Sequence, residues 1–448
     1  NEPSVFNGPE VTMPKDCLSL ASVEHREWHN LYGMYFARAT AEGLALRGRT
    51  AAQSSSKSKT AAAARPFVLT RSFFAGSQRW GAVWTGDNAA KWSHLEIAAP
   101  MLLSLSVCGF SFAGADAGGF FGDPEPELFA RWIAAAAFTP FFRGHAHHDA
   151  KRREPWSFGE PWTQRVRAAV ADRYSWLPYW YSLFALSRFT GQPVMRPLWA
   201  HFATDPATLT LQDQWLLGAD LMVKPAQKPG VSTVDVYFPS GDWFDLRDDA
   251  KYSGKATRTV AAGLDLGVPV FQRSGSILPR RLRLRRSTTA MRRDPYTLSI
   301  ALSDDGKAHG SLFLDDQSSF AFRDASAYAW ASFSFSDGTL TNTVFRGPDL
   351  PPFLSSRTAA ALGATTAAVS LEEDDDDDDD DVLGLADVVE RLVLYGLPKP
   401  PKAVVLDDQR PLTFSWRSDA TLVVRKPDTP VGRPWTIAFH FDDASSSS

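Results

Sequence analysis

The chain has 448 residues, of which 44% are hydrophobic, so it is long enough to bury the cores of two or three domains. Its net charge of −4 depends on an unbroken run of eight aspartates at 374–381; without that run, 47 basic residues stand against 43 acidic ones. This near balance gives no reason to expect a nucleic-acid partner, and no run of about 18 apolar residues predicts a membrane span. The two cysteines, Cys17 and Cys108, cannot define a disulfide framework.

The first 190 residues alternate short apolar segments, polar loops and helical patterns. Apolar spacing predicts helices over 24–47, 93–105, 125–137 and 165–189, with an exposed loop over 50–65. Short strands are predicted at 66–70, 81–84, 109–112 and 139–142. The alternation is typical of a (β/α)8 barrel, but closure needs about twice as many strands. The sequence therefore predicts the carboxyl-terminal half of a (β/α)8 TIM barrel over residues 1–190.

From residue 191 the sequence changes to short alternating segments separated by glycine and proline turns. This pattern predicts two β-sandwich domains, a proximal one over 191–275 and a distal one over 276–448. The acidic insertion near 372–381 is expected to be a disordered loop of the distal domain. The alternating segment 281–285 (RLRLR) is predicted to be a solvated strand face rather than an anion site.

Polar side chains of several kinds follow the predicted barrel strands. The loops after parallel strands build the active-site mouth of such a barrel, so these side chains should ring one pocket. Carboxylates beside arginine and histidine suit sugar hydroxyls, while aromatic rings supply apolar faces for the sugar. The side chains at these strand ends are Arg71, Arg79, Trp84, Asp87, Asp116, Phe120, Arg143 and His145.

Asp87 has two interpretations that spacing alone leaves open. It follows the predicted strand 81–84 and is close in sequence to Trp84 and Arg79, which suits proton transfer. A loop aspartate that caps the next helix is an equally good interpretation. His145 is likewise open to a purely structural role.

A histidine cluster, His145, His147 and His148, raises the question of a metal. Catalytic zinc sites usually add a helix or a carboxylate ligand at a defined spacing, and that spacing is missing here. No metal and no cofactor are therefore predicted.

Four motifs are similar to those of one known family. They are NEPSVFNGPE (1–10), RSFFAGSQR (71–79), WTGDN (84–88) and GAD (114–116). On these motifs the chain resembles glycoside hydrolase family 31, and within it the two-subunit neutral α-glucosidases of the glucosidase II type. The resemblance implies that Asp87 is the general acid/base of a retaining two-carboxylate mechanism. It implies further that Arg79, Trp84, Asp116, Phe120 and His145 line the subsite for the cleaved glucose, with Arg143 in support.

The resemblance also bears on the nucleophile, which the family carries two residues before the Asn of the Asn-Glu-Pro-Ser motif. That asparagine is Asn1, so the expected nucleophile is not in the printed sequence. Neither Glu2 nor Asp116 is expected to replace it, because the family keeps both beside it. The chain is therefore expected to be a fragment that is inactive alone.

The function implied by the resemblance is removal of terminal α-linked glucose from the N-glycans of glycoproteins. The family resemblance also implies a smaller β subunit as partner and a place in the lumen of the endoplasmic reticulum. Two alternatives stay open: a family 31 α-glucosidase acting on α-glucans, and a non-catalytic carbohydrate-binding remnant.

Overall fold

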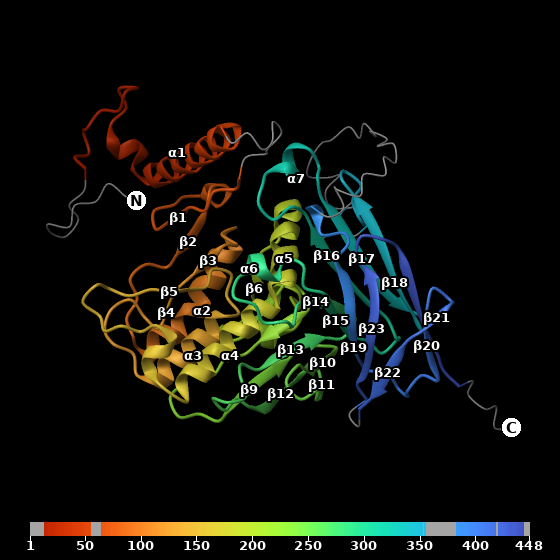
Figure 1. Cartoon of the computed structure of the whole chain (residues 1–448). Helices are drawn as coiled ribbons and strands as arrows, with labels where there is room; N and C mark the ends of the chain where they lie inside the picture. The colour runs from red at the N-terminus through yellow and green to blue at the C-terminus, as the bar shows by residue number, and fades with distance from the viewer. Residues whose placement is uncertain (1–12, 55–63, 353, 355–381, 418–419, 443–448) are drawn as a thin grey trace.

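A computed structural model of the chain shows helices and short strands of a partial barrel packed beside two β-rich regions (Figure 1). The structure describes residues 13–54, 64–352, 354, 382–417 and 420–442; for residues 49–54 the description covers the backbone alone. The motif at 1–10, the acidic insertion and the last six residues lie outside the described residues. Among the described helices, none is both long and apolar enough to cross a bilayer.

The barrel region contains five strands and five α-helices within the described residues. In chain order they are α1 (His25–Ser54), β1 (Leu69–Thr70), the short 3-10 helix η1 (Ser77–Arg79), β2 (Ala82–Trp84), α2 (Trp92–Val107), β3 (Ala113–Gly114), β4 (Asp116–Ala117), α3 (Pro126–Ala136), β5 (Arg143–Gly144), η2 (Pro155–Phe158), α4 (Trp162–Ser175) and α5 (Leu177–Thr190). Strand β1 pairs in parallel with β2, β2 with β3, and β4 with β5. Parallel strands that alternate with helices confirm the partial barrel.

Four predicted boundaries in the barrel are wrong. The strands predicted at 109–112 and 139–142 pair only from Ala113 and Arg143, and Gly114 lets these two segments approach closely. A Cβ on Gly114 would lie 2.1 Å from the carbonyl oxygen of Phe141. The helix predicted over 165–189 is two helices, α4 and α5, and Pro178 lies in the first turn of the second. Helix α1 continues to Ser54, so the predicted loop begins later than residue 50.

The β-rich regions begin after α5. The first contains β6 (Met195–Arg196), η3 (Leu198–Ala200), η4 (Pro206–Thr208), β7 (Trp215–Leu217), β8 (Leu221–Val223), β9 (Thr233–Phe238), β10 (Asp242–Asp245), β11 (Lys251–Ser253), β12 (Ala256–Ala261) and β13 (Val270–Arg273). These strands form a six-stranded sheet, in the order β11-β10-β13-β8-β7-β6, and a separate β12-β9 pair. Buried side chains such as Val236, Phe238 and Phe271 pack between the two sheets. Two layers around one core are the arrangement of a β-sandwich.

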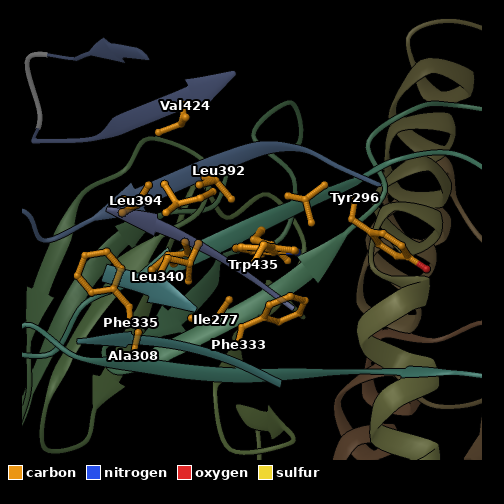
Figure 2. Packing of buried hydrophobic residues seen from close by; sticks show 14 of the residues in the cluster. Ile277, Tyr296, Ala308, Phe333, Phe335, Leu340, Leu392, Leu394, Val424 and Trp435 are labelled. Carbon is orange, nitrogen blue, oxygen red and sulfur yellow. The ribbon is translucent and has the colours of Figure 1, made fainter. Parts of the chain in front are cut away.

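The second β-rich region is one large sheet. Its elements are β14 (Ser276–Arg280), α6 (Thr288–Met291), β15 (Tyr296–Ala301), β16 (Ala308–Leu314), α7 (Ala321–Asp324), β17 (Ala329–Ser336), β18 (Thr339–Arg346), β19 (Val388–Tyr395), β20 (Ala403–Leu406), β21 (Arg410–Pro411), β22 (Thr413–Trp416), β23 (Leu422–Pro430) and β24 (Trp435–His440). The strand order is β21-β20-β24-β18-β17-β16-β14-β15-β19-β23-β22. Val404 near one end of this order and Val424 near the other belong to the same buried cluster. Figure 2 shows part of this cluster, including Val424. The sheet therefore curls over on itself to enclose its core.

The barrel region and the first β-rich region share a hydrophobic core. Val83 of β2 and Trp180 of α5 belong to the same buried cluster as Leu217 of β7, Leu221 of β8 and Val270 of β13. This cluster contains residues from both sides of residue 190. Apolar side chains of the first β-rich region therefore pack against the barrel strands and stabilise their position. The division of the chain into domains at residues 190 and 275 stays a prediction.

Candidate active site

Asp87 lies in the loop after β2, at the carboxyl end of that strand. The loop leaves the sheet after the amide of Thr85 donates to the carbonyl oxygen of Gly114, and Gly86 turns it with a φ of +87°. The Asp87 side chain is 34% exposed, and its Oδ2 lies 3.5 Å from a guanidinium nitrogen of Arg71. Helix α2 has Lys91 at its N-cap position and no side-chain cap, so the helix-capping interpretation of Asp87 is wrong.

Asp116 is the buried carboxylate of this region, with its side chain fully inaccessible. Strands β4 and β5 place it directly opposite Arg143, and the Arg143 guanidinium donates to its Oδ1. Burial raises the pKa of Asp116; the charges of Arg143 and His145 oppose this rise, and the charge of Asp87 adds to it. Asp87 and Asp116 are therefore close enough to interact electrostatically.

Trp84, at the end of β2, packs against the Asp116–Arg143 ion pair through its contact with Arg143. The Arg143 guanidinium carbon lies 5.2 Å from the centroid of the Trp84 ring, within range of a cation–π contact. Within the described part of the chain, the Trp84 Nε1 and the Asp116 Oδ2 are both buried without a hydrogen-bond partner. A buried donor and a buried acceptor left unpaired are costly unless a ligand satisfies them. A sugar hydroxyl both donates and accepts, so this pair suits a sugar.

Phe120 and His145 face one another across two loops. Their ring centroids are 5.3 Å apart, at an interplanar angle of 32°. Phe120 comes from the loop after β4 and is half-buried, whereas His145 follows β5 and is exposed. Together they form an aromatic surface next to the Asp116–Arg143 pair.

Asn88 joins the loops that carry these groups. Its side-chain oxygen accepts from the amide of Phe120 at 2.8 Å, and its side-chain nitrogen donates to the carbonyl oxygen of Asp116 at 3.1 Å. Its backbone carbonyl also accepts from the amides of Phe120 and Phe121. We did not assign Asn88 a role from the sequence, although it ends the WTGDN motif. Its position next to Asp87 was the available signal.

Arg153 stabilises the loop after β4, which carries Phe120, by hydrogen bonds to its backbone. Its guanidinium is buried and donates to the carbonyl oxygens of Gly119 and Gly122 at 2.5 Å each. Burial lowers its pKa. Nothing local in the sequence marks Arg153 for this role, because its partners are about thirty residues away along the chain.

Arg79 is the predicted site residue that the structure does not bring together with the others. Its Nε donates to the carbonyl oxygen of Gly76 at 3.3 Å, and its guanidinium lies over the Trp80 ring. Arg71, and not Arg79, is the arginine beside Asp87. A role for Arg79 stays a prediction.

One cavity in the described part of the structure lies away from these residues. It has a volume of about 770 Å³ between α3, α4 and the segment 262–269, and its lining contains none of the predicted site residues. The candidate active site is instead marked by the charged groups that converge at the strand ends.

Two family profiles match the chain. The glycosyl hydrolases family 31 TIM-barrel domain matches residues 1–183, and the glycosyl hydrolase family 31 C-terminal domain matches residues 191–278. The chain belongs to glycoside hydrolase family 31. Its fold is a partial TIM barrel followed by β domains, as the sequence predicted.

Individual relatives fit this assignment. A probable glucan 1,3-alpha-glucosidase of Arabidopsis thaliana is 42% identical over 98% of this chain and 44% of that protein. A glucosidase II alpha subunit solved with Glc1Man2 bound superimposes with a TM-score of 0.84, at 37% identity, over 98% of this chain and 45% of that one. A heterodimeric complex of ER glucosidase II, with the catalytic subunit and the binding domain of the regulatory subunit, gives 0.83 at 38% identity, covering 98% and 45%. The chain thus spans less than half the length of these relatives.

Proposed function

We propose that this chain carries the acid/base side of a retaining α-glucosidase active site, with Asp87 as the general acid/base. The observation that carries the proposal is the placement of two carboxylates in different environments at neighbouring strand ends. Asp87 is accessible and loosely paired with Arg71, whereas Asp116 is buried and bound by Arg143. Retaining glycosidases need one carboxyl group that can reach the glycosidic oxygen to donate and later accept a proton.

Asp116, Trp84, Phe120 and His145 bind the glucose ring in this proposal. Asp116 Oδ2 and Trp84 Nε1 form hydrogen bonds to sugar hydroxyls, since both atoms are buried and unpaired in the described structure. Phe120 and His145 supply the adjoining ring surface. Arg143 orients Asp116 and opposes the rise in its pKa that burial causes, although the pKa stays above its ordinary value.

The attacking carboxylate is proposed to come from outside the residues printed here. Asp116 is not proposed for this role, because one of its oxygens already accepts from the Arg143 guanidinium. A nucleophile must approach the anomeric carbon, about 5–5.5 Å from the acid carboxyl group. We expect the purified 448-residue chain to bind a glucose-like iminosugar in calorimetry but not to hydrolyse an aryl α-glucoside. Turnover by this chain would mean that Asp116 or another of its own carboxylates attacks.

The proposed substrate is an oligosaccharide with terminal α-linked glucose, as on an N-glycan. Support comes from the Glc1Man2-bound relative and from the relative described as acting on a 1,3-alpha linkage. By the same reasoning we propose a smaller regulatory subunit as partner and the endoplasmic reticulum as location, since the ER glucosidase II relative is a heterodimer. A storage α-glucan is the competing substrate, and relative rates on α-1,3- and α-1,4-linked glucose disaccharides distinguish the two.

The experiment that tests the role of Asp87 is Asp87→Asn in enzyme that contains the attacking carboxylate. Loss of a general acid should lower the rate by about 10²–10⁴-fold on glycans, whose leaving group needs a proton. An aryl glucoside with an acidic phenol leaving group should be partly spared in its first step. Asp337→Asn is the matched control, because Asp337 lies in the β17–β18 turn with a φ of 50°, a conformation that asparagine tolerates. Equal effects on both substrates would rule out Asp87 as the acid.

A binding-only role is the second candidate function. It is favoured by the same unpaired polar atoms of Trp84 and Asp116, which suit sugar binding without any chemistry. Tight iminosugar binding that is unchanged by Asp87→Asn, together with no turnover in any assembled form, would favour binding alone.

A further inference from the structure

The loop after β5 holds a second cluster of side chains that differs from the predicted sugar site. Its members are His147, His148 and Asp149, whose possible ligand atoms all lie within 4.8 Å of one another. The sequence had suggested a histidine trio that included His145. In the structure His145 packs on Phe120 instead, and Asp149 supplies the carboxylate that the trio lacked.

Two nitrogen–oxygen distances in this cluster are close to the distance between neighbouring ligand atoms of tetrahedral zinc, although each nitrogen faces a different oxygen of Asp149. The Nδ1 of His147 lies 3.5 Å from Asp149 Oδ2, and the Nε2 of His148 lies 3.3 Å from Asp149 Oδ1. Tetrahedral zinc with bonds of about 2.0–2.1 Å sets its ligand atoms about 3.3–3.4 Å apart. To bind one ion, both imidazoles must turn toward one point beside the Asp149 carboxylate, and the Asp149 N–H must leave the Nδ1 of His147.

The contacts around the His147 ring also fit a ligand. Its Nδ1 accepts the backbone N–H of Asp149 at 3.2 Å, so that nitrogen carries the lone pair that a metal takes over. Its ring lies 5.5 Å from that of Phe120 and 5.4 Å from that of Phe121, and its own amide donates to the carbonyl oxygen of Phe120. These contacts keep the imidazole next to Phe120 and Phe121 before any metal arrives.

The other two members are open to solvent. The side chains of His148 and Asp149 are 82% and 78% exposed, so an ion can enter directly and keep water at its remaining positions. Two imidazoles with one carboxylate suit zinc, whereas Mg²⁺ and Ca²⁺ prefer ligand sets made of oxygen.

We propose that His147, His148 and Asp149 form a Zn²⁺-binding site at the rim of the candidate active site. The site takes no part in the glycosidase chemistry, and the proposal does not depend on that function. Because His145 precedes the cluster by two residues and stacks on Phe120, bound zinc holds this aromatic surface in one arrangement.

Titration calorimetry with zinc chloride on the purified protein tests the proposal. We expect one saturable zinc site, no comparable heat with magnesium chloride, and binding at least about tenfold weaker in His148→Gln and in Asp149→Asn. Both residues are exposed, so these variants should fold, and His440→Gln, an exposed histidine on β24, is the matched control that keeps wild-type affinity. Cobalt substitution gives a second readout, because tetrahedral Co²⁺ absorbs strongly in the visible range. Saturable zinc binding that both variants retain, or no saturable binding, would overturn the site.

Discussion

Asp116 and Arg143 determine the electrostatics of the candidate site at the scale of single residues. The carboxylate is fully buried and the guanidinium is 24% exposed, so the pair is only partly screened by water. Removal of one partner leaves the other as an uncompensated charge beneath the Trp84 ring. The pair therefore links the stability of the loops to the chemistry they present.

Arg143→Met tests how far the stability of these loops depends on the Asp116–Arg143 pair. The variant leaves the Asp116 carboxylate buried without its cation, and we expect a loss of about 3 kcal/mol in the free energy of unfolding. Arg283→Met removes a partner from the more exposed Arg283–Glu390 pair and should cost under about 1 kcal/mol. Denaturant unfolding followed by tryptophan fluorescence compares the two. Equal losses would mean that Asp116 is solvated or protonated in the folded protein.

Asp116 should also give stability a pH dependence with a definite sign. Its pKa in the folded protein lies above the ordinary value of 3.8, so the folded state holds the proton more tightly than the unfolded chain does. Its contribution to stability is therefore present at acidic pH and is lost as pH rises through the folded-state pKa. Relative to Asp116→Asn, the wild type should lose stability as pH rises above about 4. A difference that grows more favourable with pH would contradict this sign.

At the scale of elements, the loop between β4 and α3 depends on glycine. Gly119 has a φ of +86°, and a Cβ there would lie 2.3 Å from the backbone nitrogen of Ala90. The two loops that carry Phe120 and Asn88 thus touch through their backbones, and a flexible side chain cannot move aside to relieve the contact. The position of the aromatic surface is fixed by this approach.

Gly119→Ala should therefore destabilise the protein by more than the backbone strain of a left-handed residue, because the added Cβ also clashes with the Ala90 backbone. Gly191→Ala is the matched control, because Gly191 has a left-handed φ of +71° and its added Cβ meets nothing within 4 Å. The control should cost about 1–2 kcal/mol from the backbone conformation. Gly119→Ala should cost clearly more in thermal unfolding and should weaken iminosugar binding. Equal costs would show that the loops separate easily.

The sequence predicted these elements unevenly, for physical reasons that differ between residues. Asp87 and Asp116 were found because side chains at neighbouring strand ends must converge, whatever the details of the loops. Arg281 was misread: the alternation over 281–285 suggested a solvated strand, but β14 ends at Arg280, and Arg281 is buried against Asp387. A pair 106 residues apart in sequence leaves no trace in local periodicity.

At the scale of the whole molecule, the barrel is joined to the large sheet through α5. Tyr181 of α5 donates to Asp315 Oδ1 at 2.6 Å and accepts from Arg65 at 2.9 Å, and the next residue, Ser182, accepts from the amide of Phe313. These contacts bring together the segment before β1, the helix and the end of β16. In Figure 1, α5 lies alongside the large sheet.

Tyr181→Phe should loosen this connection without changing the packed ring. Loss of hydrogen bonds to the buried Asp315 carboxylate should cost about 1.5–3 kcal/mol of unfolding free energy. Tyr174→Phe in α4 is the control, because the described structure gives the Tyr174 hydroxyl no hydrogen bond, and its cost should be near zero. Calorimetric unfolding of both variants makes the comparison. A negligible loss in Tyr181→Phe would place the connection in the apolar contacts instead.

Asn88 has a further consequence for how a ligand enters. It binds the amides of Phe120 and Phe121 and the carbonyl oxygen of Asp116, while it is covalently next to Asp87. The acid loop and the aromatic loop therefore cannot swing apart separately without breaking the same hydrogen bonds. The two loops should therefore move together as one rigid unit when a ligand enters. In hydrogen exchange, the amide protons of Phe120 and Phe121 should then exchange with solvent at one shared rate.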